Sequence, residues 1–274
     1  MTSIELKTLL GKINSEESKD MDEKINLMLS LRGQYAGEEE HARLVKDADV
    51  FSTLIKIVED DNEPHIHDHI LLKLYVLLAE TYVELEDYRR LKEIAHGVLG
   101  LIRHEVTPWE AMEDTMPRII GAVGESVFNH ALYELLLRYV RAAFVSGRLD
   151  TVSTGRIRRL LKLRVLLNEG EWPYSLFNKD LQDAISKLLT SGELLKIILN
   201  PQIGHLRKDP VEYTWEWENI YYDVEDKLNE RFANAPRQMG FCFLFWRAKQ
   251  EVLEKEYGIL WRSPSLMNPH VIFD

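Results

Sequence analysis

The sequence has little cysteine, glycine and proline, and it has no long apolar run. Its 274 residues include one cysteine, Cys242, with 14 glycines and 9 prolines. A single cysteine excludes an internal disulfide, and the absence of disulfides is typical of a reducing cytoplasm, where we expect this protein. The apolar run 241–246 is far shorter than the about 18 residues of a membrane span. Residues 1–20 lack the apolar stretch of a signal peptide, so we expect neither feature.

Basic residues are also in deficit. The chain has 34 Lys and Arg against 45 Asp and Glu, a formal net charge of −11. Because phosphate contacts need a basic surface, this balance argues against nucleic-acid binding. Apolar residues make up 45% of the chain, which is enough for a substantial core and excludes a disordered chain.

Familiar catalytic motifs are absent as well. The sequence contains no glycine-rich phosphate loop, dinucleotide fingerprint, zinc-protease helix motif or serine nucleophile elbow. We therefore expect no cofactor and favour a protein without catalytic activity, although a rare enzyme class stays open.

What the sequence does contain is helical periodicity, with apolar residues recurring every three or four positions. This pattern predicts an all-α fold. The predicted helices cover residues 3–13, 18–34, 38–59, 64–85, 88–104, 108–122, 126–146, 154–168, 176–199 (broken near Ser191), 211–232 and 238–257. The helices 64–85 and 126–146 are apolar around most of their circumference, so we expect both in the interior. Short connections between the helices predict antiparallel helical hairpins.

One of these hairpins carries a recognisable pattern between residues 74 and 103. The pattern is made by Tyr75, Leu78, Ala79 and Tyr82 on the first helix, 85–88 at the turn, and Leu91, Ala95 and Val98 on the second helix. It resembles a tetratricopeptide (TPR) repeat. The turn has Glu86 where the family favours glycine, and Arg103 stands where a proline often closes the unit. A weaker echo runs from Leu136 to Arg148.

The resemblance implies hairpins stacked in a right-handed TPR-like array, which would offer a concave groove to a peptide or protein. We assign residues 1–204 to this array. Residues 205–274 are rich in aromatic side chains and predict a helical cap with an extended tail, packed on the array or continuous with it in one domain. The tail 259–274 is too apolar to be disordered. We expect it to cover the end of the array or, alternatively, to dock on a second copy and form a homo-oligomer.

The helix at 154–168 concentrates positive charge in an acidic protein. Its basic residues are Arg156, Arg158, Arg159, Lys162 and Arg164. One interpretation is a patch that binds an acidic peptide or protein partner. The other is internal, with these cations neutralised by the acidic N-terminal 64 residues.

Two aromatic residues of the C-terminal part fall off its helical core pattern. Trp215 and Tyr222 lie seven residues apart on a different face from the apolar positions of 211–232. They either pack under the final segment or form an exposed anchor for a partner, where Trp and Tyr are enriched. Cys242, between Phe241 and Phe243, is expected to be a small buried hydrophobe.

A histidine-rich segment suggests an alternative function. His65, His67 and His69 lie among four carboxylates in ten residues, and imidazole and carboxylate groups both suit zinc. A helix that starts at Pro64 would place His65 and His69 on one face and His67 on another, so a solvated acidic helix start is the competing interpretation. The sequence therefore favours a protein-interaction or scaffold module, with a metal-binding protein or metal-dependent enzyme as the alternative.

Overall fold

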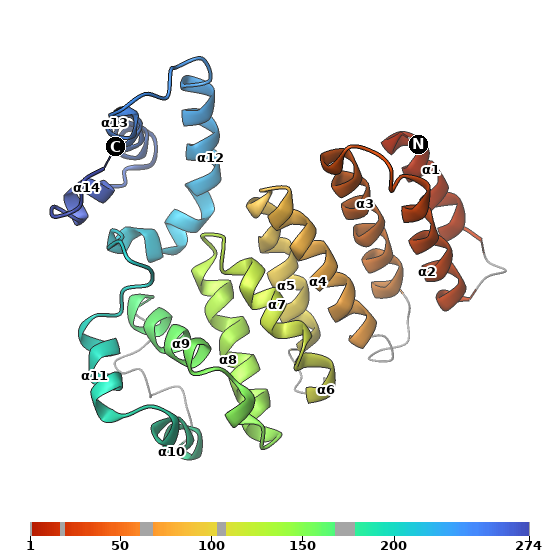
Figure 1. Cartoon of the computed structure of the whole chain (residues 1–274), viewed down its shortest axis with the longest axis horizontal. Helices are drawn as coiled ribbons and strands as arrows, with labels where there is room; N and C mark the ends of the chain where they lie inside the picture. The colour runs from red at the N-terminus through yellow and green to blue at the C-terminus, as the bar shows by residue number, and fades with distance from the viewer. Residues whose placement is uncertain (1, 17–19, 61–67, 103–107, 168–178, 274) are drawn as a thin grey trace. The chain divides into compact units, whose positions relative to one another are not determined.

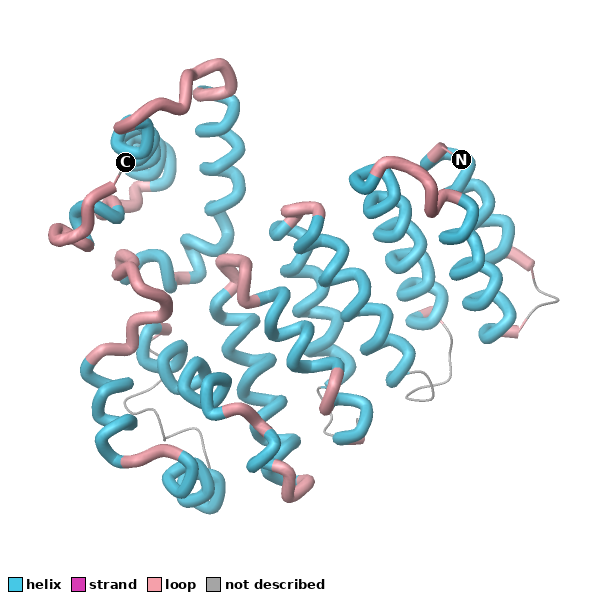
Figure 2. The backbone as a smooth tube through the Cα atoms, in the orientation of Figure 1, coloured by secondary structure: helices cyan, strands magenta, loops and turns pink. Residues whose placement is uncertain are grey.

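The computed structural model of the chain describes residues 2–16, 20–60, 68–102, 108–167 and 179–273. These residues form helices and loops without a strand, which confirms the all-α fold class (Figure 1, Figure 2). Helices long and apolar enough to cross a bilayer do not occur in this part of the chain. The chain divides into two compact units, Met1–Ser126 and Val127–Asp274. The boundary predicted at residue 204 lies inside the second unit and stays a prediction about its subdivision.

The elements of the first unit follow the predicted helices closely. They are α1 (Ser3–Asn14), α2 (Met21–Ser30), η1 (Leu31–Gln34), α3 (Glu40–Glu59), α4 (Asp68–Glu84), η2 (Tyr88–Arg90), α5 (Leu91–Leu101), α6 (Trp109–Met112) and α7 (Thr115–Val123), where η marks a 3₁₀ helix. The predicted helix 108–122 is therefore two helices. The start of α1 is fixed by a capping box, in which Thr2 and Glu5 bond to each other's backbone N–H groups.

Helix α4 is the central helix of this unit. It packs against α3, α5 and α7, and half or more of its circumference is covered. Its buried residues are Leu71, Leu72, Leu74, Tyr75, Val76, Leu78, Ala79 and Thr81. The predicted interior position of this helix is confirmed, because a helix with neighbours on several sides needs an apolar stripe of this width.

The turn between α4 and α5 is a Schellman motif, the helix ending in which a left-handed residue redirects the chain. The amide of Asp87 donates to the Tyr82 carbonyl (2.9 Å), and the amide of Glu86 donates to the Val83 carbonyl (3.0 Å). Glu86 has φ = 56°, and it is the one non-glycine residue with positive φ in the described part of the chain. Helix α8 ends in the same motif with Gly147 (φ = 67°) at the corresponding place. The position where a TPR turn favours glycine thus has the backbone conformation that favours glycine.

Helices α4 and α5 are in close contact at Gly97. A Cβ atom at this position would lie 2.1 Å from the hydroxyl oxygen of Tyr75, which is well inside van der Waals contact. The Tyr75 hydroxyl donates to the Glu59 carboxylate at the end of α3 (2.5 Å). Burial, followed by this hydrogen bond, raises the pKa of Tyr75. One glycine and one tyrosine therefore join three consecutive long helices.

The second unit continues the helical pattern. Its elements are α8 (Asn129–Val145), η4 (Leu149–Thr151), α9 (Thr154–Leu166), α10 (Lys179–Leu188), α11 (Ser191–Leu199), η5 (Pro210–Tyr213), α12 (Trp215–Arg231), α13 (Phe241–Tyr257) and α14 (Pro264–Met267). The predicted break near Ser191 is confirmed by the separation of α10 from α11. Helix α8 is buried along most of its length, as its broad apolar stripe predicts.

Helices α12 and α13 pack around a core of their own. Its buried members are Trp217, Val224, Leu228, Ala248, Leu253 and Trp261. The buried ammonium of Lys249 lies 4.6–5.3 Å from the centroids of three aromatic rings, those of Trp217, Tyr221 and Trp261. It also donates to the Glu225 carboxylate (2.5 Å). Three of the aromatic residues of this region therefore surround a buried, paired cation.

The tail after α13 is only partly extended. Gly258, with φ = 67°, ends α13 after Tyr257, which is the predicted last residue of the helix 238–257. Trp261 is buried, and the Asp209 carboxylate accepts from the Arg262 guanidinium Nε (2.7 Å), so the start of the tail is held. The expectation of an extended tail is wrong for α14, because Pro264 occupies a first helical position, where its fixed φ is favourable.

Candidate functional site

The basic helix α9 has one apolar and one charged side. Ser153 begins the helix by accepting a hydrogen bond from the Arg156 amide. Ile157, Leu160 and Leu161 are buried, and α9 packs against α8 and α11. Because residues three and four apart share a face, this packing leaves Arg158, Arg159 and Lys162 together on the partly exposed side.

These three cations line a cavity of about 380 Å³. Gly155 of α9 also lines the cavity, and Ile203 and Gly204 contribute from the loop that follows α11. The Lys162 ammonium donates to the Gln202 carbonyl oxygen (2.7 Å), which holds this loop against the helix. The arrangement concentrates positive charge in a concavity, which is suited to an anionic group.

One acid of the same unit already contacts this surface. The Arg158 guanidinium donates to Glu193 of α11 at 2.5 Å. Hydrogen bonds from the Thr190 backbone, from Arg158 and from the Thr190 hydroxyl lower the pKa of Glu193 to about 2. Among the described residues, the acid that pairs with Arg158 therefore comes from α11 and not from the N-terminal 64 residues.

The other two basic residues lie away from the cavity. The Arg156 guanidinium bonds locally to the Ser153 hydroxyl (3.3 Å). Arg164 is 1% exposed and donates to the Tyr133 hydroxyl (2.9 Å) in the interior. The assignment of Arg164 to a partner-binding surface is wrong, because the residue falls on the buried side of α9 beside Leu160 and Leu161.

Trp215 and Tyr222 have different environments. Trp215 is 53% exposed, and one face of its indole stacks on the His130 ring with 3.8 Å between centroids. Tyr222 packs against Phe128 (5.6 Å) and edge-on against Tyr221 (5.1 Å). Trp215 thus presents one free face for an aromatic contact, and Tyr222 is mainly a packing residue.

Sequence analysis did not predict the buried pair of His130 and Glu218 that lies beneath Trp215. The Glu218 carboxylate accepts from the His130 amide (3.0 Å) and lies 2.8 Å from His130 Nδ1. The carboxylate thereby caps the first turn of α8, whose N–H groups lack intrahelical acceptors. Burial raises the pKa of Glu218 and outweighs the opposing effect of its hydrogen bonds to His130. The two residues are 88 positions apart, so no local pattern reveals the pair.

The described structure includes one of the three predicted metal ligands. His65 and His67 lie outside the described residues, and His69 is exposed in the first turn of α4. Within the described ranges, no group of three His, Cys, Asp or Glu side chains has metal-binding geometry. Cys242 is partly exposed, so the expectation that it is buried is wrong. It lies in the first turn of α13, where Phe243 and Leu244 are also exposed.

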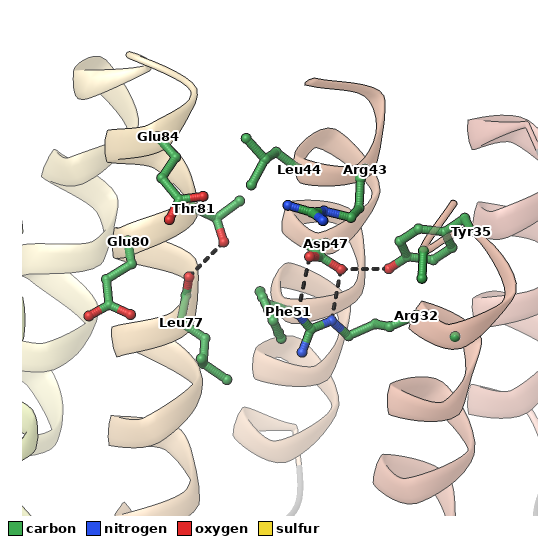
Figure 3. Close-up of a pocket in the computed structure, with 12 residues that line it drawn as sticks. Arg32, Tyr35, Arg43, Leu44, Asp47, Phe51, Leu77, Glu80, Thr81 and Glu84 are labelled. Atoms are coloured by element: carbon green, nitrogen blue, oxygen red, sulfur yellow. Dashed lines mark hydrogen bonds and ion pairs between the residues drawn. The ribbon is translucent and has the colours of Figure 1, made fainter. Parts of the chain in front are cut away.

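The first unit contains a groove that sequence analysis did not predict (Figure 3). It has a volume of about 460 Å³ and is lined by residues of η1, α3 and α4. Asp47 of α3 is buried in it and is held by the Arg32 guanidinium (2.8 and 3.1 Å) and by the Tyr35 hydroxyl (2.8 Å). Burial, followed by the bond to Asp47, raises the pKa of Tyr35. These three side chains fix the wall of the groove.

The two units differ strongly in charge. Residues 1–126 contain 14 basic and 26 acidic side chains, a net charge of −12, while residues 127–274 contain 20 basic and 19 acidic side chains. The acidity of the whole protein is thus a property of the first unit. Comparison of the chain with models of protein families, with curated proteins and with solved structures found no match.

Proposed function

We propose that this protein is a non-catalytic interaction module that binds an acidic segment of a partner protein through helix α9. The observation that carries the proposal is the cavity lined by Arg158, Arg159 and Lys162. Guanidinium groups suit carboxylates because their N–H donors can bind both oxygens at once. The second unit has 20 basic and 19 acidic side chains, so it carries no net negative charge of its own that would oppose an anion at this cavity.

Glu193 indicates how such a segment would bind. Its carboxylate contacts Arg158 while its backbone and side chain also cap α11. A partner carboxylate would take up the same kind of contact with the neighbouring cations of the cavity. The stacked, half-exposed Trp215 is a second candidate contact, since aromatic residues are enriched at the centres of interfaces.

The experiment uses a fluorescein-labelled peptide of repeating Glu-Leu-Gly units and the full-length protein at physiological salt. We expect fluorescence anisotropy to report binding by the wild type. The combined variant Arg158→Glu, Arg159→Glu, Lys162→Glu should bind at least about tenfold more weakly, because charge repulsion replaces complementarity at the cavity. Circular dichroism checks that the variant keeps its helical content.

The matched control reverses three lysines elsewhere in the same unit. Lys187, Lys196 and Lys208 are exposed and do not line the cavity, so Lys187→Glu, Lys196→Glu, Lys208→Glu makes the same change in net charge. The control should bind clearly more tightly than the cavity variant, since it makes the same change in net charge but keeps the three cations that line the cavity. Equal losses in both triple variants would show that binding follows net charge, which would refute the α9 site.

Self-association is a second candidate, supported by the apolar surface of the tail. Leu260, Leu266 and Ile272 are 78%, 64% and 92% exposed, and contiguous exposed apolar surface is typical of protein contacts. The mass of the protein in solution, measured by light scattering, tests this candidate. A dimer that Leu260→Asp, Leu266→Asp dissociates would support it, and a monomer at all accessible concentrations would exclude it.

A further inference from the structure

The groove of the first unit is lined by three consecutive elements. Figure 3 shows α3 between η1 and α4, with side chains of all three directed into the groove. Arg32 from η1 lies over the Phe51 ring of α3, 4.9 Å from its centroid. Leu44 and Leu77 add apolar surface from α3 and α4. The groove therefore combines apolar surface with charged side chains.

Most charges of the groove are neutralised inside the unit. Arg32 pairs with Asp47. The Arg118 guanidinium of α7 forms two hydrogen bonds with the Glu80 carboxylate, at 2.7 and 2.6 Å. These are bidentate pairs, the strongest arrangement for such groups, and they leave little residual charge for a ligand.

Glu84 and Arg43 differ from these pairs. Glu84 lies one turn after Glu80 on α4, is exposed, and forms no ion pair with any residue that the structure describes. Arg43 is 41% exposed, and its nearest acid, Glu40, is 3.9 Å away, at the limit of an ion pair. Figure 3 shows the Arg43 guanidinium directed across α3 toward the α4 side. The groove thus offers the Glu84 carboxylate, which has no ion-pair partner among the described residues, and the Arg43 guanidinium, whose N–H donors are only partly used.

We propose that this groove binds a second type of partner segment, a peptide that presents a lysine or arginine to Glu84 and an adjacent apolar side chain to Leu44 and Leu77. Backbone carbonyl oxygens of the segment accept from Arg43, which has more N–H donors than its contact with Glu40 uses. The sign of the partner charge follows from Glu84 and from the net charge of −12 of the unit. That field attracts a basic segment to the groove and repels an acidic one.

The proposal goes beyond the α9 site, because it concerns the other unit and a partner of opposite charge. Its probe is a fluorescein-labelled peptide of repeating Arg-Leu-Gly units, titrated with the full-length protein at physiological salt. We expect Glu84→Lys to weaken binding by about tenfold or more, since it turns the one uncompensated attraction into repulsion. Glu110→Lys is the matched control, because Glu110 is exposed in the same unit on α6 and does not line the groove. It should change binding by less than about twofold under the same screening.

A steric variant separates the groove from general attraction to an acidic surface. Ala36 is exposed and lines the groove, so Ala36→Trp fills it without changing any charge. We expect this variant to weaken binding of the basic peptide by about tenfold, as burial of the apolar side chain becomes impossible. Equal losses in Glu84→Lys and Glu110→Lys, or wild-type affinity in Ala36→Trp, would overturn the proposal. Neither outcome would bear on acidic-peptide binding at α9.

Discussion

The backbone of Glu86 has the left-handed conformation, so we predict that replacing Glu86 with glycine stabilises the protein. The φ of 56° at Glu86 is unfavourable for a residue with a Cβ atom, at a cost of about 1–2 kcal/mol. Glycine removes this cost but loses about 0.5–1 kcal/mol more chain entropy on folding. Glu86→Gly should therefore raise the free energy of unfolding by about 0.5–1 kcal/mol, since no hydrogen bond or ion pair of the Glu86 side chain is lost among the described residues.

Urea denaturation followed by far-ultraviolet circular dichroism measures this change. The midpoint should move to higher urea with an unchanged slope, because the surface exposed on unfolding stays the same. Gly147→Glu is the reciprocal control, because Gly147 holds the same place in the α8 turn with φ = 67°. It should destabilise by a similar amount, about 0.5–1 kcal/mol, because the strain of the left-handed conformation is again partly offset by the smaller loss of chain entropy. A lower midpoint for Glu86→Gly would refute the assignment of strain to this turn.

Three further predictions concern packing, pH and metal. Gly97→Ala should lower the free energy of unfolding by about 1–2 kcal/mol, because the collision of its methyl group with Tyr75 outweighs the about 1 kcal/mol that Ala gains over Gly within a helix; a thermal melt of wild-type stability would contradict this. The pKa of Glu218 is raised above its ordinary value of 4.5, so its protonation stabilises the folded state. This contribution is present below pH 4.5 and is lost as the pH rises through the folded pKa. Denaturation measured from pH 4 to 7 should show this loss of unfolding free energy in the wild type but not in Glu218→Gln. The same pH dependence of stability in both proteins would disprove the role of Glu218. For protein purified without a histidine tag, the interaction module predicts no stoichiometric zinc, whereas one zinc per chain that His65→Ala, His67→Ala removes would favour the metal-binding alternative.

The sequence predicts local structure well because helical periodicity is a local property. The breadth of the apolar stripes places α4 and α8 in the interior, and Gly258 marks the end of α13. The tight contact between α4 and α5 is less accessible from sequence. The ring of Tyr75 packs where Gly97 has no side chain, and this pairing depends on how the two helices are rotated about their axes, which spacing along one helix does not determine.

The candidate sites depend on contacts between distant residues, and these were only partly predictable. Helical spacing places Arg158, Arg159 and Lys162 on one side of α9 and Arg164 on the apolar side with Leu160 and Leu161. The burial of Arg164 was therefore predictable from its spacing, and its charge alone obscured it. Pairs such as Asp47 with Arg32 and Glu218 with His130 join separate helices. No spacing rule within one element reveals them. The groove of Figure 3 therefore becomes visible only once η1, α3 and α4 are assembled.

The most direct test of the central claim is an affinity capture from extract of the native cells, analysed by mass spectrometry. Wild type, the α9 triple reversal and the Lys187, Lys196, Lys208 control are compared side by side. The account predicts a stoichiometric protein partner with an acidic segment, retained by the wild type and the control and lost by the α9 reversal. A partner captured equally by all three proteins, or by none, would contradict the role of α9.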